Sequence, residues 1–561
     1  MSCGSARVLY MTDSDYKASK EAFVSGATGS TVTHVNFISA VALCSIALHA
    51  AVRARINVPE SLTFVSEWTL LALPLLLSMT LFADMPLVLC LLLLLPILLL
   101  YILPYKRDDP PPLSPIGIPR ALSPSRPVDV SSGSNPLPAI SPGSRMTIPS
   151  LPSLTIYRSH MLLMTFIAIL AVDFPIFPRS LSKCETFGVS LMDLGVGSFV
   201  FSQGVVSAIP ILKDPAHLIV PALPKIITVI KKMLPVFFLG IIRVISVKGT
   251  EYPEHESEYG THWNFFFTLA LLPILQVILH PAIAYIPISL LGFLVALSHQ
   301  IGLSLTPLQY YALNAPRTNL LSANKEGLIS LAGYLAIHLL GLSTGTVILP
   351  PSPSDFRRQQ IKLGERIRGG LSTISVPVPD GIQTDSRRNR KALQRQDTKT
   401  ITELFSYATL WWTCLGICYL ASEGGGVSRR LANLPYVVWV AAYNTSFIMC
   451  YLVLDILAAP ATNSRSQGWE GASSQLEPPS SETFYKEPKA KPKSRAPALL
   501  NAINLNGLAL FLLANVGTGL INLSMSTMYA SNTVAMLVLS AYSFSLCLVA
   551  WMCRENRIWR M

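Results

Sequence analysis

The chain alternates between long apolar runs and shorter polar segments. About 13 of the runs have the length and hydropathy of a helix that crosses a lipid bilayer. The sequence therefore predicts an all-α fold, a polytopic transmembrane helical bundle of about 13 spans. The expected spans are residues 35–51, 63–83, 86–104, 156–172, 188–212, 233–248, 264–280, 282–298, 327–349, 402–420, 435–459, 505–525 and 533–552.

Three long polar segments interrupt the spans. They are rich in Pro, Ser, Arg or Gln, so we expect disordered linkers rather than domains. The predicted organisation is a polar N-terminal segment (1–34), spans 1–3 (35–104), a Pro/Ser-rich linker (105–155), spans 4–9 (156–349), a basic linker (350–401), spans 10–11 (402–459), a third linker (460–504), spans 12–13 (505–553) and a basic tail (554–561).

The distribution of charge predicts an orientation. The three linkers, the tail and the 213–232 connection share one face, where Lys and Arg outnumber Asp and Glu roughly twofold. On the opposite face, the 249–263 loop has four Glu and no Lys or Arg. The positive-inside rule therefore places the linkers and the C-terminus in the cytosol, and the N-terminus across the membrane.

Composition narrows the class of protein. Residues are 51% hydrophobic and 13% charged, with a mean hydropathy of +0.47, which excludes a soluble enzyme with a single anchor. The net charge of +12 does not indicate nucleic-acid binding, because no basic patch is interleaved with aromatic residues. The nine cysteines show no metal or disulfide spacing, so no metal is expected. The polar N-terminus lacks the apolar core of a signal peptide.

Charge is concentrated in residues 171–201, AVDFPIFPRSLSKCETFGVSLMDLGVGSFVF. Two prolines prevent a continuous helix after the fourth span, so Asp173, Arg179 and Lys183 lie at its non-cytosolic end. Asp173 and Lys183 could approach each other there. The alternative is ordinary interfacial charge, in which Arg179 and Lys183 snorkel and Asp173 caps a helix.

Asp193 falls within the first turns of the fifth span. A carboxylate at this depth normally faces a partner or a wet cavity, so a functional and a structural interpretation both stay open. His262, in THWNFFF, could be a general base or bond a neighbour. Other polar residues in the spans are expected to form helix-to-helix contacts; these are His338, Asn444, Asn515 and Asn522.

No nucleophile elbow, Walker loop, zinc-protease motif or CxxC pair occurs in a suitable context. Motifs alone leave a polytopic membrane protein of unknown activity. Transporters also have intramembrane charge and glycine-bearing helices, so a lipid transporter or flippase is one alternative.

Several phrases nevertheless form a recognisable set. KEAFVSGATGSTVTHVN and AVDFPIFPRSLSKCETFGVSLMDLGVGSFVFSQGVVSA resemble two signatures of the fungal GPI-anchored wall transfer protein family, the inositol acyltransferases of glycosylphosphatidylinositol (GPI) assembly. Four further phrases resemble family blocks in the family's order, and the resemblance runs from about Lys20 to the last span; they are EYGTHWNFFFTLALLPIL, NKEGLISLAGYLAIHLLG, NLPYVVWVAAYN and FLLANVGTGLINLSM.

The resemblance implies a multi-pass protein of the endoplasmic reticulum membrane, with a lumenal N-terminus and a cytosolic C-terminus. It implies transfer of a fatty acyl chain, expected to be palmitoyl, from acyl-CoA to the inositol ring of glucosaminyl-phosphatidylinositol. The expected partners are these two substrates and membrane lipids. Palmitoyl-CoA would be a co-substrate, with no permanently bound cofactor.

The resemblance also carries residue roles. The family pattern VDFPIFPRxxxK falls on Asp173 and Lys183, so these are the expected catalytic residues. We expect Asp173 to activate the inositol hydroxyl and Lys183 to hold the thioester oxygen or the substrate phosphate. His262 is a secondary candidate for proton transfer. Asp193 would orient Lys183 or shape the pocket, within an expected substrate-binding set of Arg179, Asp193, Asn264 and Lys325.

Two alternatives to catalysis follow from the same residues: a lipid transporter, and a non-catalytic scaffold of the GPI pathway. The halves of the chain show no clear self-similarity, which counts against a transporter with internal repeats. Acyl-CoA is made in the cytosol, whereas the VDFPIFPRxxxK pattern maps to the other face. The sequence leaves the route of the donor open.

Overall fold

The computed structural model describes residues 19–20, 22–23, 25–102, 148, 150–249, 256–368, 395–421, 426–458 and 496–558. Within them the chain is helical, with one isolated β-bridge between Ser30 and Val189. The helices are α2 (Val32–Arg55), α3 (Thr63–Glu67), α4 (Leu73–Ser78), α5 (Pro86–Leu100), α6 (Pro152–Ala171), α7 (Leu191–Lys213), α8 (Ala222–Gly249), α9 (Glu256–Tyr259), α10 (Phe265–Ile278), α11 (His280–Ile283), α12 (Ile288–Leu305), α13 (Leu308–Asn314), α14 (Leu320–Ala323), α15 (Lys325–Ile348), α16 (Asp355–Arg368), α18 (Asp397–Ala421), α19 (Leu434–Leu457), α21 (Ala498–Leu505), α22 (Gly507–Ser524) and α23 (Asn532–Met552).

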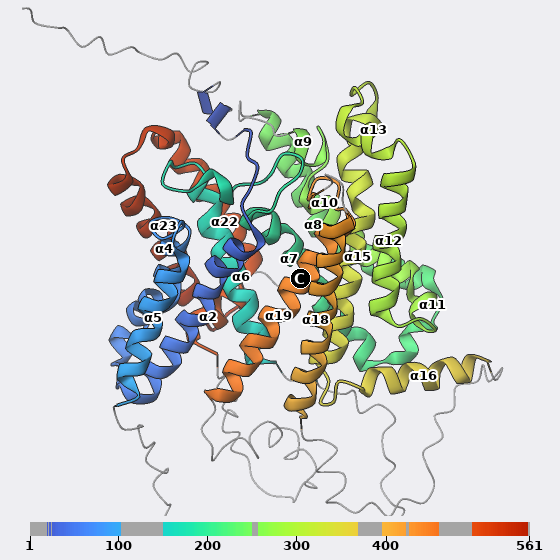
Figure 1. Ribbon diagram of the computed structural model, residues 1–561, viewed down its shortest axis with the longest axis horizontal. Coiled ribbons are helices and arrows are strands. Elements are labelled where there is room, and N and C mark those ends of the chain that lie inside the picture. The colour runs from blue at the N-terminus through green and yellow to red at the C-terminus, as the bar shows by residue number, and fades with distance from the viewer. Residues whose placement is uncertain are drawn as a thin grey trace, which may run out of the picture.

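The long helices stand side by side in one bundle (Figure 1). Ten helical segments of the described chain are long and apolar enough to cross a membrane, with α3 and α4 counted together as Glu60–Ser78. The helices α5 and α10 are apolar but shorter, and α8 is longer but carries five Lys and Arg residues. The all-helical membrane class is therefore confirmed, while the count of 13 spans and the orientation stay predictions.

The break predicted at Pro281 is present, but the boundary of the following span differs. The predicted span 282–298 begins at Ile288 in α12, because α11, which contains Pro281, forms a separate short turn before it. The predicted span 505–525 corresponds to α22, which Asn506 separates from α21.

The prediction of disorder is wrong for parts of two linkers. The helices α16 and α21 lie inside the ranges 350–401 and 460–504, and the rest of these ranges is largely outside the described residues. Helix α16 is ordered because Phe356 is buried against the bundle and the Gln360 amide donates to the carbonyl oxygens of Ile283 and Ile286. The 105–155 linker is described only at residue 148 and from residue 150 onward.

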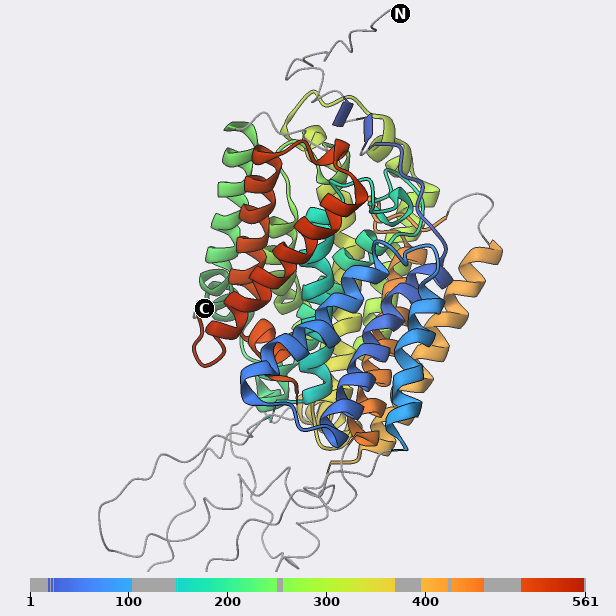
Figure 2. The same ribbon diagram turned by 90° about the vertical axis from the view of Figure 1, so that its left-hand side faces the viewer.

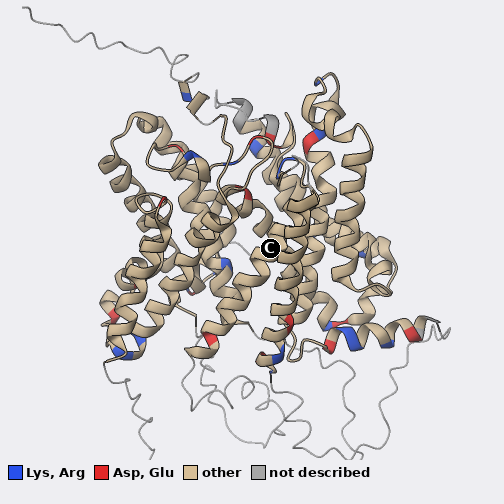
Figure 3. Cartoon of the chain, viewed as in Figure 1, with Lys and Arg blue, Asp and Glu red and all other residues tan. Residues whose placement is uncertain are grey.

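The bundle has two distinct ends. Helices α9 and α13 and the segment between α6 and α7 lie at one end, which we call the Asp173 end, whereas α16 runs across the opposite end (Figure 1). Charged residues gather towards both ends and are sparse between them (Figure 3). Figure 2 shows C-terminal helices beside the first helices of the chain, where Phe544 of α23 lies 5.2 Å from Phe64 of α3 between ring centroids. Helix α22 packs on α6.

The closest crossing in the bundle joins α7 and α15. A Cβ added at Gly204 would lie 2.1 Å from the carbonyl oxygen of His338, and one added at Gly341 would lie 2.1 Å from that of Phe201. The two backbones are therefore in direct contact, as small residues allow in membrane helices. This contact fixes the middle of α7 against α15.

The crossing predicts that a Gly→Ala substitution lowers stability at one helical glycine and does not lower it at another. Gly341→Ala should destabilise the protein, because overpacking of this kind costs about 1–3 kcal/mol or more. Gly416→Ala in α18 is the matched control; its Cβ would meet nothing within 4 Å, so the better helix propensity of Ala should leave stability unchanged or raised. The measurement is the temperature at which half of the protein stays monodisperse in detergent. Equal temperatures for both variants would contradict the packing.

Candidate functional site

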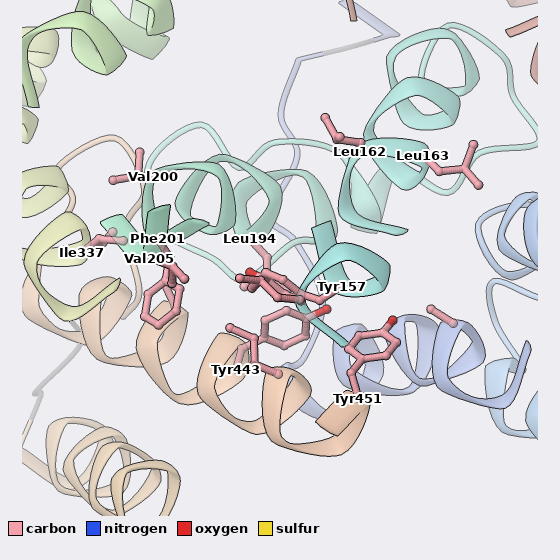
Figure 4. Close-up of a cluster of buried hydrophobic side chains, with 14 of the residues drawn as sticks. Tyr157, Leu162, Leu163, Leu194, Val200, Phe201, Val205, Ile337, Tyr443 and Tyr451 are labelled. Atoms are coloured by element: carbon pink, nitrogen blue, oxygen red, sulfur yellow. The ribbon is translucent and has the colours of Figure 1, made fainter. Parts of the chain in front are cut away.

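A cavity of about 1070 Å³ opens between α6, α7, α8, α10, α19 and α22. At the Asp173 end it is lined by charged and amide side chains, and further along by apolar and aromatic residues. Tyr157, Tyr443 and Tyr451 are gathered between α6 and α19, with Leu194 of α7 nearby (Figure 4). The polar residues at the Asp173 end include Lys20, Asp173, Lys183, Glu258, Asn264 and Asn522.

Arg179 shapes the turn that follows α6. Its Nη2 donates to the carbonyl oxygens of Val172, Phe174 and Phe177 at 2.6, 3.3 and 3.1 Å. Its guanidinium carbon lies 4.2 Å from the ring centroid of Phe23. Arg179 is not among the residues that line the cavity. The position of Arg179 thus does not support the expectation that it binds substrate. Its N–H groups instead donate to backbone carbonyls and stabilise the turn that carries Asp173.

Asp173 is buried and is held from two other parts of the chain. The Lys20 Nζ lies 3.4 Å from Asp173 Oδ1, and the Asn522 Nδ2 donates to Asp173 Oδ2 at 2.8 Å. The Asn522 Oδ1 in turn accepts from the Lys20 Nζ at 3.0 Å and from the Thr527 hydroxyl at 3.0 Å. The N-terminal segment and the end of α22 thereby meet at the carboxylate.

The expected approach of Asp173 to Lys183 is not found as an ion pair. The Lys183 Nζ instead donates to Glu258 Oε2 at 2.8 Å. This pair is partly open, with side chains 32% and 19% exposed, so the lysine can exchange partners at low cost. Asp173 and Lys183 still line the same cavity. The structure brings them to one site without joining them.

The Asp193 carboxylate forms an ion pair and hydrogen bonds within the protein. Its Oδ1 accepts from Arg429 Nε at 2.6 Å, and its Oδ2 accepts from the Ser190 hydroxyl at 2.8 Å and the Cys184 N–H at 3.0 Å. Asp193 and Arg429 are 1% and 2% exposed, and Asp193 is not a lining residue. Its position supports the structural interpretation. It orients Lys183 only indirectly, by holding the backbone of the next residue.

The other expected site residues lie in different places. Asn264 lines the cavity, but its Oδ1 caps α10 and its Nδ2 donates to the Gly240 carbonyl. The His262 N–H donates to Asn324, and Lys325 donates to the carbonyl oxygen of Ala315; neither residue lines the cavity. Asn264 is therefore the one member of this group that faces the cavity.

Cys184 lines the cavity as a free thiol. Burial, with the nearby carboxylate of Asp193, raises the pKa of this thiol to about 12. Nucleophilic attack by cysteine requires the thiolate, which is scarce at neutral pH with such a pKa. The environment of Cys184 therefore does not favour a role as a nucleophile.

The sequence identified Asp173 and Lys183 as site residues, but it did not identify the residues that pair with them. Lys20 and Asn522 lie in two of the phrases quoted above, but nothing in their spacing places them beside Asp173. Glu258 is one of four Glu in an acidic loop, and Arg429 is one of two adjacent arginines in a turn. The general rule that a charged residue near a membrane core needs a partner indicated that partners exist, but not which residues they are.

The Asp193 pair yields a stability prediction. Asp193→Asn leaves Arg429 buried without a counter-ion, which costs about 3–5 kcal/mol. Asp214→Asn is the control, because Asp214 is exposed and caps a short helix outside the cavity. The thermal midpoint should fall for Asp193→Asn and hold for the control, and adding Arg429→Met should recover part of the loss. A normal midpoint for Asp193→Asn would contradict a structural role.

Comparison with known proteins assigns a family to this architecture. The model of the GWT1 family matches residues 16–553. A "GPI-anchored wall transfer protein 1" from Cryptococcus neoformans var. grubii is 42% identical over 73% of this chain and 63% of that protein's length, which is under two thirds. Proteins of the same name from Cryptococcus neoformans var. neoformans and Aspergillus fumigatus are 36% and 38% identical; the matches cover 97% and 95% of this chain and 99% and 96% of theirs. The chain belongs to the GWT1 family.

Proposed function

We propose that the protein is an O-acyltransferase of GPI-anchor biosynthesis in the endoplasmic reticulum membrane. It moves a fatty acyl chain, palmitoyl in our proposal, from acyl-CoA to the inositol ring of glucosaminyl-phosphatidylinositol. Membership of the GWT1 family and the names of its relatives support a role in the GPI pathway. The reaction itself is our inference from the family resemblance and the site.

One observation carries the proposal. A single cavity joins a buried carboxylate and a partly exposed lysine to a long apolar interior. A lipid acyl transfer needs these three parts: a base for the hydroxyl proton, a cation for the developing oxyanion and a dry place for the chain. A scaffold needs none of them.

The length of the cavity suits a donor that crosses part of the membrane. Arg158 within α6 and Asp173 just beyond its end both line the cavity, about 22 Å apart along the helix axis at 1.5 Å per residue. Arg158 Nε and Asn504 Oδ1 are buried and make no hydrogen bond within the described chain. In our proposal this far end faces the cytosol and receives polar groups of CoA.

The residues suggest a direct transfer. The hydroxyl oxygen of the inositol bonds to the thioester carbon while Asp173 accepts the hydroxyl proton. Lys183 stabilises the negative charge that develops on the carbonyl oxygen. The carbon–sulfur bond then breaks, and the departing CoA thiolate takes the proton from Asp173. Lys183 would leave Glu258 for this purpose. We assign no step to His262, which does not line the cavity.

The test is acyl transfer in membranes from cells that lack their own inositol acyltransferase. The substrates are labelled palmitoyl-CoA and glucosaminyl-phosphatidylinositol, with expression matched among variants. Wild type should form acylated lipid, while Asp173→Asn and Lys183→Met should lose about 100-fold or more of the rate. Lys213→Met and Asp214→Asn, exposed residues outside the cavity, are matched controls that should stay active.

Each failure has a separate meaning. No product from folded wild type would overturn the acyltransferase assignment and favour a transporter or a scaffold. Full activity of the Asp173 and Lys183 variants would support the acyltransferase assignment but show that these two residues are not catalytic.

The cavity also predicts control of chain length. Gly195 lines the cavity, and a Cβ added there meets nothing within 4 Å, so Gly195→Leu should fill the cavity without displacing neighbours. We expect the preferred donor to shorten, with palmitoyl transfer falling several-fold relative to a shorter chain, since each buried CH₂ contributes about 0.8 kcal/mol. Gly416→Leu, in open space outside the cavity, is the control. An unchanged preference, measured with mixed acyl-CoA donors, would place the chain elsewhere.

A further inference from the structure

We propose that the N-terminal segment forms part of the active site, with Lys20 as the positioning residue that supplies the counter-charge of Asp173 and keeps it aimed at the cavity. This inference rests on the proposed function and deepens it. The two lysines then have different roles: Lys20 positions the general base Asp173, and Lys183 interacts with the substrate. Neither the charge pattern nor the VDFPIFPRxxxK pattern assigns a role to Lys20.

The contacts of Lys20 are those of a counter-ion. Its Nζ lies 3.4 Å from Asp173 Oδ1 and donates to Asn522 Oδ1 at 3.0 Å, while the Asn522 amide donates to Asp173 Oδ2. The three side chains thus close a ring of polar contacts, and all of them line the cavity. The Lys20 and Asp173 side chains are only 9% and 3% exposed, so water screens this pair little.

The segment that carries Lys20 is fixed along its length to the segment after Asp173. Phe23 packs beneath the Arg179 guanidinium, and the Gly26 N–H donates to Glu185 Oε1 at 2.8 Å. The Ser30 N–H donates to the Val189 carbonyl at 2.6 Å, which forms the β-bridge. These contacts make the described residues 19–20, 22–23 and 25–31 a strap across the segment between α6 and α7. Lys20 is therefore held in place by the fold.

Gly29 and Gly188 allow the strap to lie this close. Both have positive φ, 85° and 147°, and a Cβ on either would come within 2.7 Å of the Cys184 sulfur. Glycine alone adopts these conformations without strain. The close approach joins the strap to the part of the segment that follows Lys183.

The other charged groups near Asp173 have different partners. Lys183 pairs with Glu258, Arg429 pairs with Asp193, and Arg179 donates to three carbonyl oxygens. Glu185, which also lines the cavity, accepts from the strap backbone. A buried carboxylate needs a compensating charge to stay ionised, and a general base must be ionised to accept a proton. Arg179 is near enough to Asp173 for an electrostatic interaction, but Lys20 is the cation that forms an ion pair with it in the described chain.

The test compares Lys20→Met and Lys20→Arg with wild type in the membrane assay, across a range of pH. Loss of the cation leaves the carboxylate without its counter-charge, so the acidic limb of activity should move to higher pH. At neutral pH, kcat for Lys20→Met should fall about tenfold or more, with part of the activity returning at higher pH. Lys20→Arg should keep the wild-type limb. Lys213→Met is the charge-matched control.

A double variant separates positioning from folding. On the Asp173→Asn background, Lys20→Met should cause little further loss, because the residue it supports is already gone. Active wild type with a fully active Lys20→Met and an unshifted limb would overturn this inference and leave the proposed function intact. A uniform loss at every pH that Lys20→Arg does not rescue would also overturn it, in favour of a purely structural strap. Inactive wild type would instead refute the proposed function.

Discussion

The cost of placing charge near a membrane interior governs this structure. At the Asp173 end, the buried carboxylates of the described chain are each paired with a cation: Asp173 with Lys20, Asp193 with Arg429, and Glu326 with Arg317 and Arg430. The first pair joins the N-terminal strap to the segment after α6, and the pairs of Arg429 and Arg430 join α7 and α15 to the turn before α19. A site that needs ionised groups can exist here only because the fold supplies their partners.

The bundle is unevenly rigid around that site. On one side, α7 and α15 touch backbone to backbone through glycines, and the buried Trp439 and Tyr436 of α19 pack nearby. On the other side, α6, α8, α10 and α22 leave the cavity open between them. The first turn of α7 is held to α19, because the Tyr436 hydroxyl donates to the Asp193 carbonyl oxygen at 2.8 Å. The open cavity and the ordered charged end thus depend on different contacts.

Much of the fold could be predicted from sequence, since apolar length alone specifies membrane helices. Pro281 also indicated the break between the seventh and eighth spans. The helical turn of α11 and the ordered α16 could not be predicted, because packing against distant segments decides them. For the site, the resemblance identified Asp173 and Lys183, and both line the cavity. It could not show that Asp173 pairs with Lys20 and Lys183 with Glu258, because such pairs depend on three-dimensional proximity. Asp193 looked equally functional and structural by sequence; its bonds to Arg429 and Ser190 account for its burial.

The central claim is that this chain transfers an acyl group by itself. The most direct measurement uses purified wild type in lipid nanodiscs, with labelled palmitoyl-CoA and glucosaminyl-phosphatidylinositol as the only substrates. Acylated lipid and free CoA are quantified together. The account predicts equal amounts of both, formed only when both substrates are present. A folded protein that yields neither, or that releases CoA without acylated lipid, would contradict it.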